Sequence, residues 1–448
     1  MPVCGSGKAI SHLQRYAESL SGRHSFHKDL PRPLFPMYTV SVPTLLDMTE
    51  VLPHEALMSQ GALVEFHQDL GKAAFVSHQW VGVDHPDPEC QQLRVLQDAF
   101  KSLLSEMDFV PLEIFTESLV PSAKPLETAQ FRDQPLFIWY DYFSCPQLKQ
   151  SLQLSWTSGS GNQPDALSKA IDSIPAYIAK TSFFFVLCPV VNNASQSSVF
   201  TLHTWAERGW CRVEKACREL SMDASWIVIR SATKMELIAT PAASANFGAP
   251  GEGAFTVPDD RLKLGPVLLK ALERRLLQHL QQQDLSGYRV LLNLQPVHLR
   301  GFLVEPVQDL VPGFEASRPD LDPTALSVEK FLFQNGFFAA DDKDSTGWYP
   351  LNYAALSGKV ELLRGLLACR ADLNLVTKKD MVEAGVPMWT SALAICVMFR
   401  HNEAARLLVE AKAKLGGGIQ PAIHQAAIAN NAEGIRILCE AGCSPHLK

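Results

Sequence analysis

Four short runs of continuously apolar residues mark the first half of the chain, and helix-patterned stretches separate them. The runs span residues 72–80, 135–147, 182–190 and 224–230. Strands that are apolar throughout are buried on both faces, which is typical of a parallel sheet covered by helices. We therefore predict an α/β domain over residues 37–235, with one parallel sheet flanked by helices.

Polar and acidic side chains follow the first two runs. Ser77 and Trp80 lie at the end of the first run, and Asp141 follows the apolar part of the second. Because ligands gather at the carboxyl ends of parallel strands, we expect these three side chains to line one cleft as binding residues. The alternative for Asp141 is a carboxylate that is hydrogen-bonded to the amides of a neighbouring loop.

The stretch RGWCRVEKACREL predicts an amphipathic helix over residues 208–220. Trp210 and Glu214 lie one turn apart and project from the same side of that helix. A carboxylate at the edge of an apolar stripe is either a paired or snorkelling charge, or a group placed in a cleft for chemistry. We expect this helix beside the cleft of Ser77 and Asp141, and the pattern leaves both interpretations of Glu214 open.

The C-terminal third repeats a short motif. The segments YPLNYAA, TSALAICV and QPAIHQAA, which start at residues 349, 390 and 420, each precede a second amphipathic helix. This pattern resembles the ankyrin repeat, in which stacked helix pairs bury their small-residue faces against one another. The resemblance implies an all-α ankyrin-repeat solenoid over residues 326–448, with a capping helix near 328–337 and a lengthened hairpin near 378–389.

The remaining segments are predicted to be an N-terminal extension and a connector. Residues 1–36 end in the proline-spaced LPRPLFP, which reads as an extended lead-in. Residues 236–325 combine an Ala-, Gly- and Pro-rich linker or surface loop with connecting helices. One of these, the leucine-rich basic helix 261–283, is either a packing helix between domains or a helix that binds a membrane surface or a partner.

Composition narrows the class of protein. A net charge of −7 argues against a general nucleic-acid binder, and the longest apolar run, 182–191, is too short to span a membrane. We therefore expect no nucleic-acid partner and no membrane span. The 10 cysteines form no CxxC motif and lie on apolar stripes, which indicates buried thiols in a reducing, cytoplasmic compartment.

One loop carries residue types that bind metals. HQWVGVDHPDPEC, residues 78–90, contains histidine, aspartate and cysteine. Its two prolines and irregular spacing match no tetrahedral template, so we predict a shaped loop over the sheet edge and no metal site.

Three motifs of the first half follow one another in the order of a known family. They are FVSHQWVG with Ser77 and Trp80, WYDYFSCPQ with Asp141, and RGWCRVEKA with Trp210 and Glu214. The series resembles the fungal heterokaryon-incompatibility (HET) domain. Its last element is also similar to the Trp-Cys-x-x-Glu motif of Toll/interleukin-receptor (TIR) domains.

The resemblance covers about residues 60–235 and implies a flavodoxin-like, HET/TIR-like fold. Two positions depart from the HET pattern: Ser144 replaces its cysteine, and Val81 precedes the glycine. In catalytically active TIR domains the matching glutamate serves NAD cleavage, with the tryptophan beside the nicotinamide end. The resemblance thus implies Glu214 as a catalytic carboxylate and NAD as a substrate, with no cofactor required.

Two functions follow from these resemblances. In the first, the chain is a signalling or interaction protein: the ankyrin-like repeats bind a protein partner, and the HET/TIR-like domain self-associates or acts as an adaptor or effector. In the second, the same domain is an NAD(P)-cleaving glycohydrolase, and the repeats supply regulation or targeting. The sequence favours the first for the C-terminal third and does not decide for the domain before it.

Overall fold

The chain divides into two compact units. The computed structural model describes residues 10–21, 32–120, 122–147, 166–193, 198–221, 223–239, 248–418 and 420–444. The α/β unit comprises residues 26–271 and 300–304, and the helical unit comprises residues 1–25, 272–299 and 305–448. Most of the predicted N-terminal extension, residues 1–9 and 22–31, lies outside the described residues.

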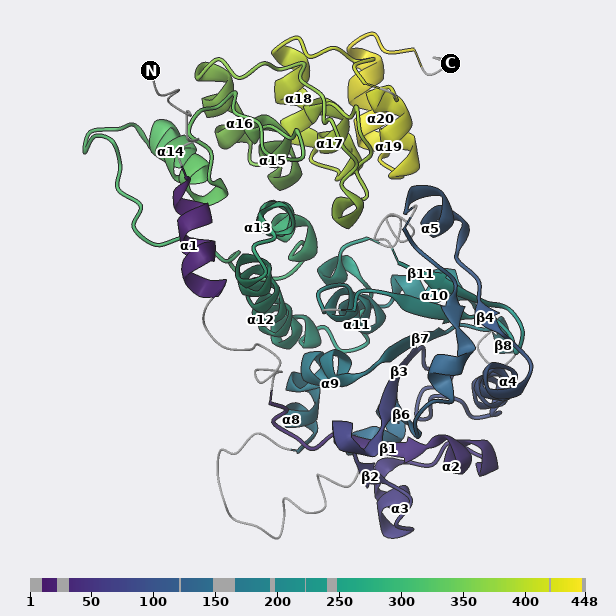
Figure 1. Cartoon of the computed structure of the whole chain (residues 1–448). Coiled ribbons are helices and arrows are strands. Elements are labelled where there is room, and N and C mark those ends of the chain that lie inside the picture. Colours follow the sequence, from purple (N-terminus) through teal and green to yellow (C-terminus); the bar gives the residue numbers. More distant parts are fainter. Residues whose placement is uncertain are drawn as a thin grey trace, which may run out of the picture. The chain divides into compact units, whose positions relative to one another are not determined.

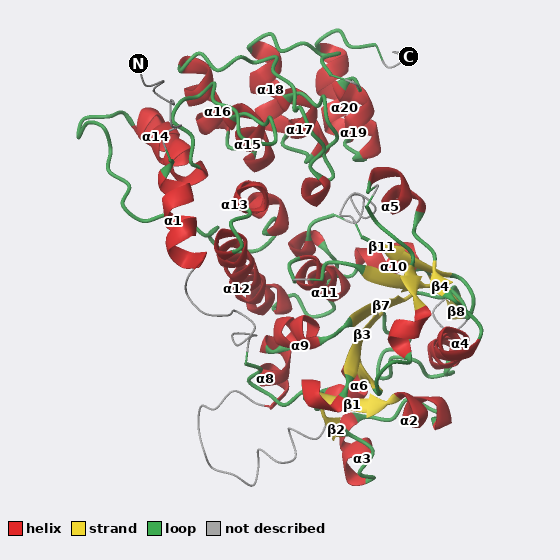
Figure 2. Cartoon of the chain, in the orientation of Figure 1, coloured by secondary structure: helices red, strands yellow, loops and turns green. Residues whose placement is uncertain are grey.

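A seven-stranded sheet forms the centre of the α/β unit (Figures 1 and 2). Its strand order is β11-β10-β7-β3-β6-β1-β2. The strands are β1 (Tyr38–Ser41), β2 (Val64–Glu65), β3 (Lys72–His78), β6 (Leu136–Tyr140), β7 (Phe183–Leu187), β10 (Trp226–Ile229) and β11 (Met235–Ile238). The four central strands β10, β7, β3 and β6 run parallel, as their continuously apolar sequences predict.

The prediction of a wholly parallel sheet is wrong at both edges. β1 pairs antiparallel with β6 and with β2, and β11 pairs antiparallel with β10. The turn between β10 and β11 is too short for a crossover, so the chain can only return antiparallel. β11 starts at residue 235, the last residue of the predicted domain, and continues into the stretch that composition assigns to the linker.

Helices cover both faces of the sheet (Figure 1). α4 (Gln91–Ser105) packs its apolar side on one face, in a core that includes Val76 of β3. α9 (Ile174–Lys180) and α11 (Gly209–Glu219) pack on the other face. There the rings of Phe75, Trp139 and Phe184 stack across three neighbouring strands, with centroids 4.1 and 5.2 Å apart.

Shorter elements complete the α/β unit. Its other helices are α2 (Val42–Asp47), α3 (His54–Ser59), α5 (Ile114–Leu119), α6 (Asp141–Ser144), α8 (Ala166–Asp172) and α10 (Leu202–Glu207). Two small ribbons pair β4 (Phe109–Val110) with β5 (Leu126–Glu127), and β8 (Val191–Asn193) with β9 (Ser198–Phe200).

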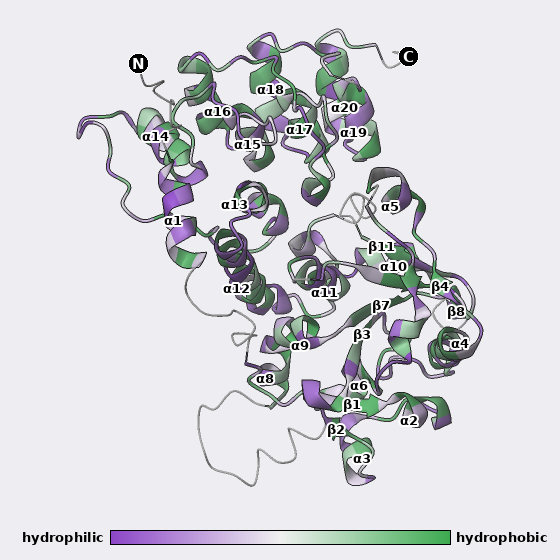
Figure 3. Ribbon diagram, viewed as in Figure 1, coloured by the Kyte–Doolittle hydropathy of each residue, from purple (hydrophilic) through white to green (hydrophobic). Residues whose placement is uncertain are grey.

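The helical unit contains two rows of stacked helices. The inner row is α13 (Leu285–His298), α15 (Pro350–Ser357), α17 (Ala392–Met398) and α19 (Ala422–Ile428). The outer row is α14 (Pro323–Asn335), α16 (Val360–Ala368), α18 (Asn402–Glu410) and α20 (Ala432–Glu440). Hydrophobic residues alternate with hydrophilic ones along several of these helices (Figure 3). α1 (His12–Ser21) packs on α13 and α14.

The first pair of the stack, α13 with α14, carries no repeat motif. Polar side chains join its two helices: Arg289 donates to the Asn335 carbonyl at 2.7 Å, and Asn293 donates to the Asn335 side chain at 2.8 Å. Later pairs are joined by the residues that begin the outer helices. His401 bonds the carbonyl of Leu356 in the preceding pair, and Asn431 donates to that of Val397. Such bonds satisfy carbonyls that a helix end leaves free.

The lengthened second hairpin is ordered and anchored. Its strand-like arms join through bridges at Val376 and Met381, and Met381 and Val386 are buried. Met388 and Trp389, at its base, are exposed. The insertion therefore adds a bridged, partly apolar hairpin to the helical unit.

The connecting helix α12 (Asp260–Gln281) lies where the sequence predicts a helix at 261–283. Its first half belongs to the α/β unit and its last part to the helical unit. Among the helices of the described ranges, none has both the length and the apolar character needed to cross a lipid bilayer.

Candidate functional site

Ser77 and Glu214 meet at the carboxyl end of β3. Successive residues of a strand face opposite sides of the sheet. Ser77 therefore faces α11, and its Oγ donates a 2.6 Å hydrogen bond to Oε2 of Glu214. Trp205 of α10 donates its Nε1–H to the same Ser77 oxygen at 3.1 Å. The result is a directed chain of hydrogen bonds from indole to hydroxyl to carboxyl.

Glu214 is buried, with 8% of its surface exposed. This burial raises the pKa of its carboxyl group from 4.5 to about 8, although the Ser77 hydrogen bond and the positive charge of Arg208 act in the opposite direction. The carboxyl group is therefore largely neutral at pH 7 in this arrangement. Glu214 is not the snorkelling charge that the helix pattern allowed, because its head group lies inside the fold.

Asp141 lies one strand away and opens α6. Its Oδ1 bonds Nε2 of His78 at 2.7 Å, and its Oδ2 accepts the indole N–H of Trp80 at 2.9 Å. Burial alone would raise the pKa of Asp141, but the charge of His78 and the bonds from His78 and Trp80 outweigh it and lower the pKa. Asp141 is thus an ionised acceptor, held from two sides.

The negative charge of Asp141 also raises the pKa of Glu214. The two carboxyl groups therefore share the carboxyl edge of the sheet, as their positions after parallel strands predict. Ser77 lies in direct contact with one of them, and Trp80 with the other.

Trp210 makes its side-chain hydrogen bond to a different segment. Its Nε1 donates a 3.0 Å hydrogen bond to Oδ2 of Asp260, the first residue of α12. The side chain is half-buried against that segment. The expectation that Trp210 lines a cleft with Ser77 and Asp141 finds no contact in support among the described residues.

Three residues of this region escaped the sequence-based choice of site residues. His78 lies at the carboxyl end of the first apolar run and is not among the chosen site residues, yet its ring bonds Asp141 and stacks on Tyr140 with centroids 3.8 Å apart. Arg208 opens the motif RGWCRVEKA but is not among the chosen site residues, although its charge acts on Glu214. Trp205 precedes that motif and belongs to no spacing that would mark it in advance.

Ser144 stands where the HET pattern has cysteine, and the structure gives it a local role. Its Oγ accepts the backbone N–H of Tyr140 at 3.1 Å, which closes the one-turn helix α6. Burial raises the pKa of the nearby thiols of Cys145 and Cys211, which disfavours their reactive thiolate forms.

In the loop 78–90, His85 and Asp87 form hydrogen bonds to backbone groups that shape the loop. His85 bonds the carbonyl of Val51, and Asp87 accepts two amides at the start of α4, from Gln91 and Leu93. Among the described residues, no group of three or more His, Cys, Asp or Glu is arranged to hold a metal ion.

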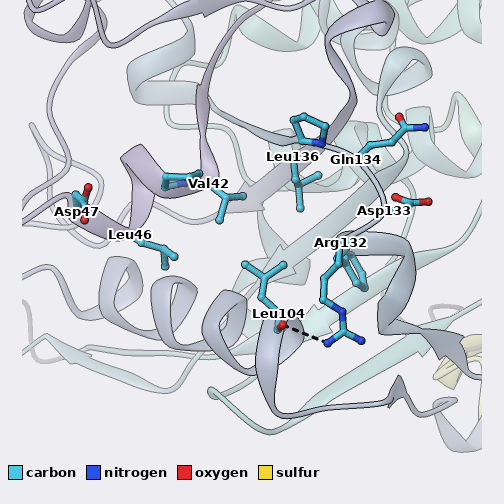
Figure 4. A pocket seen from close by; sticks show the side chains of 11 residues that line it. Val42, Leu46, Asp47, Leu104, Arg132, Asp133, Gln134 and Leu136 are labelled. Carbon is cyan, nitrogen blue, oxygen red and sulfur yellow. Dashed lines mark hydrogen bonds between the residues drawn. The ribbon is translucent and has the colours of Figure 1, made fainter.

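An open hollow lies at the opposite end of the sheet (Figure 4). It is lined by α2, by Leu104 at the end of α4 and by residues 131–136, which lead into β6. Arg132 at its edge donates to the Leu104 carbonyl at 3.2 Å. The hollow is at the amino ends of the parallel strands, so it is separate from the group around Ser77 and Asp141.

No protein-family model matches the chain, and no curated protein sequence matches it either.

Proposed function

We propose that this chain is a cytoplasmic signalling or interaction protein. In this proposal the helical unit binds a protein partner, and the α/β unit is a HET/TIR-like adaptor or effector. The observation that carries the proposal is the two-row stack from α13 to α20, because such arrays offer an extended, rigid surface to a partner. The resemblance of residues 344–374 to the ankyrin repeat supports it, and buried free thiols such as Cys396 fit a reducing compartment.

The inserted hairpin supplies an anchor for that partner. Trp389 is 44% exposed and Met388 is 37% exposed. The backbone of Trp389 has φ +61°, a left-handed conformation that bulky residues rarely adopt. It is fixed there by a 2.8 Å bond from its N–H to Thr377, while Lys378 lies over its ring. Rigidly held tryptophan and adaptable methionine are residue types on which binding energy concentrates.

A matched pair of variants tests partner binding. Proteins cross-linked to the full chain in its source cells are compared for wild type, Trp389→Ala and Arg364→Ala, an exposed change on the outer helix α16. We expect Trp389→Ala to lose a partner that Arg364→Ala keeps, with both variants melting like wild type. Equal recovery of every cross-linked protein by the three chains would contradict binding through this hairpin.

A second candidate function, NAD cleavage by the α/β unit, is favoured by the buried Ser77–Glu214 bond. Breaking the bond between ribose and nicotinamide builds positive charge on the ribose, which a positioned carboxylate stabilises. Glu214 must be ionised to do so. A cationic nicotinamide group beside it lowers its pKa, because an opposite charge favours the ionised form.

The chemistry assigns roles to the neighbouring residues. Ser77 donates to the Glu214 carboxyl group and thereby fixes its orientation. Asp141, held by His78 and Trp80, is an acceptor suited to ribose hydroxyls. The test is release of nicotinamide from NAD by the purified chain, and Glu214→Gln is the variant expected to abolish it.

A further inference from the structure

A short segment crosses the amino end of α11. We call residues 248–261 the strap; they contain the turn Pro250–Glu252 and the first two residues of α12. Its main chain pairs with the residues that lead into α11. Gly209 donates to the Ala254 carbonyl, and the Ala254 N–H donates to Glu207, both at 2.8 Å. The strap is thus bound to the helix that carries Glu214.

The contact is close because it is made by glycines. A Cβ on Gly209 would lie 2.2 Å from the ring of Phe255, and one on Gly253 would lie 2.5 Å from the Cα of Gly209. A larger residue at Gly209 would displace the Phe255 ring, and one at Gly253 would require a shift of the backbone. Arg261 lies over the Phe255 ring, with its guanidinium 5.2 Å from the ring centroid, and donates to the Gly253 carbonyl.

Side chains at the start of α11 direct their donors at acceptors of the strap. Trp210 Nε1 donates to Asp260 Oδ2 at 3.0 Å, and Arg208 Nη2 donates to Thr256 Oγ1 at 3.3 Å. Arg212 donates to the Ala249 carbonyl at 3.0 Å. The strap therefore satisfies an indole and two guanidinium groups that flank the first turn of the helix.

Two of these residues bear on Glu214. Trp210 precedes Glu214 by one turn, so its side chain leaves α11 on the same side. Arg208 is charged and lies close enough to lower the pKa of Glu214. While the strap is in place, Trp210 and Arg208 are engaged by it, and Glu214 is buried and largely neutral.

We infer that the strap is an autoinhibitory cover of the α/β unit, and that its release frees Arg208 and Trp210 and admits water to Glu214. The inference rests on the proposed NAD cleavage for its consequence, and on the contacts above for its mechanism. Release replaces hydrogen bonds to the strap by bonds to water or ligand. A hydrated carboxylate loses the desolvation that keeps it neutral, so opening favours the ionised form that the chemistry needs.

The experiment compares the full chain with Asp260→Ala, Thr256→Val and Asp259→Ala. Asp259 is the matched control, because it is exposed and adjacent to Asp260. Amide hydrogen exchange of residues 207–214 measures strap opening without reference to activity. NAD binding, followed by ligand-observed NMR, and nicotinamide release measure its consequence. Because Thr256→Val changes one exposed hydroxyl, it keeps the test valid if Asp260→Ala impairs folding.

We expect Asp260→Ala and Thr256→Val to raise exchange at the start of α11 by about tenfold or more. We expect both to increase NAD binding and nicotinamide release, and Asp259→Ala to behave as wild type. Unchanged exchange in both strap variants overturns the inference. Faster exchange combined with wild-type NAD binding and nicotinamide release also overturns the inference, but it does not contradict the proposed NAD cleavage. Faster exchange with no NAD binding by any chain overturns both the cover and the NAD proposal.

Discussion

Ser77 and Glu214 are 137 residues apart in the sequence, yet they share a buried hydrogen bond of 2.6 Å between the end of β3 and the middle of α11. The Ser77 oxygen also accepts a hydrogen bond from the indole N–H of Trp205 in α10. The two bonds join β3, α10 and α11 at the edge of the sheet where ligands gather in α/β folds. The predictions that follow depend on this arrangement.

Ser77→Ala should destabilise the α/β unit by about 1–3 kcal/mol, because it removes the acceptor of the buried Trp205 indole N–H and the donor to the buried Glu214 carboxyl group. Denaturant unfolding followed by tryptophan fluorescence measures the loss. The control is Ser102→Ala, since the Ser102 hydroxyl donates to Glu106, which is exposed and can bond water instead. Equal losses of unfolding free energy in the two variants would show that the Ser77 hydrogen bonds add no more stability than that of Ser102.

Glu214→Gln should remove a pH dependence of stability. The folded pKa of Glu214 is raised from 4.5 to about 8, so the folded state retains a proton that the unfolded state releases. The stability that this group contributes is complete below pH 4.5 and declines as the pH rises to about 8, by up to about 1.4 kcal/mol per pH unit. The free energy of unfolding of wild type minus that of Glu214→Gln, measured from pH 5 to 9, should fall and then level off. A difference independent of pH would disprove the raised pKa.

Asp141→Asn should lower the folded-state pKa of Glu214, and with it the pH range over which the stability contribution of Glu214 declines. Burial is the largest cause of the raised pKa of Glu214, and the charge of Asp141 adds to it. Removing the charge leaves the desolvation in place, so the pKa of Glu214 should fall while remaining above 4.5. The same pH series, run on Asp141→Asn with and without Glu214→Gln, measures the pH range of this decline. Asp133→Asn, which removes a carboxylate paired with Lys72 at the other end of the sheet, should leave it unchanged.

The parts of the fold that the sequence predicts are those with long patterns. Continuous apolar runs identify the four central strands, and a three- and four-residue step identifies α11. β1 and β2 are too short to show a period, and β11 lies in a stretch whose composition resembles a linker. α13 is buried on several sides, at Tyr288, Val290 and Leu294 among others, so it shows no single apolar stripe.

The candidate site is predictable to the same degree. Ser77, Trp80, Asp141 and Glu214 follow from their positions after strands and on a helix face. The partners that set their chemistry do not, because Trp205 contacts Ser77, and Asp260 contacts Trp210, only through the tertiary fold. The sequence also gives no sign that Glu214 is buried or that its pKa is raised, since its place at the edge of an apolar stripe fits an exposed carboxylate equally well.

Leu366→Asp should unfold the outer row of the helical unit near α16. Leu366 is fully buried in the core shared by α14, α16 and α18, and a buried, unpaired carboxylate costs several kcal/mol. Arg364→Asp introduces the same side chain at an exposed position of the same helix and should cost less than about 1 kcal/mol. Circular dichroism on heating separates the two. Similar melting of both variants would argue against close packing between these helices.

Asp344→Asn should weaken the packing of α13 against the turn that precedes α15, which contains Asp344. The Asp344 carboxylate is 1% exposed and pairs with Arg289 at 3.3 Å, and it also accepts from Tyr353 at 2.7 Å. Removing one partner leaves the Arg289 charge buried and uncompensated, at a cost of about 3–5 kcal/mol. Asp372→Asn, an exposed change in the next hairpin, is the control. Hydrogen exchange of α13 should rise in the first variant and stay at the wild-type level in the second.

The measurement that tests the functional account of the α/β unit most directly is nicotinamide release from NAD by the purified full chain. It is to be quantified by chromatography for wild type, Asp260→Ala and Asp260→Ala combined with Glu214→Gln. The account predicts slow release by wild type, faster release by Asp260→Ala, and a loss of about a hundredfold or more when Glu214→Gln is added. Glu214→Gln keeps size and helix propensity, so the melting of the double variant should report a folded chain. Absence of nicotinamide from every chain, or undiminished release by the folded double variant, would contradict a catalytic Glu214 and leave the α/β unit as an adaptor.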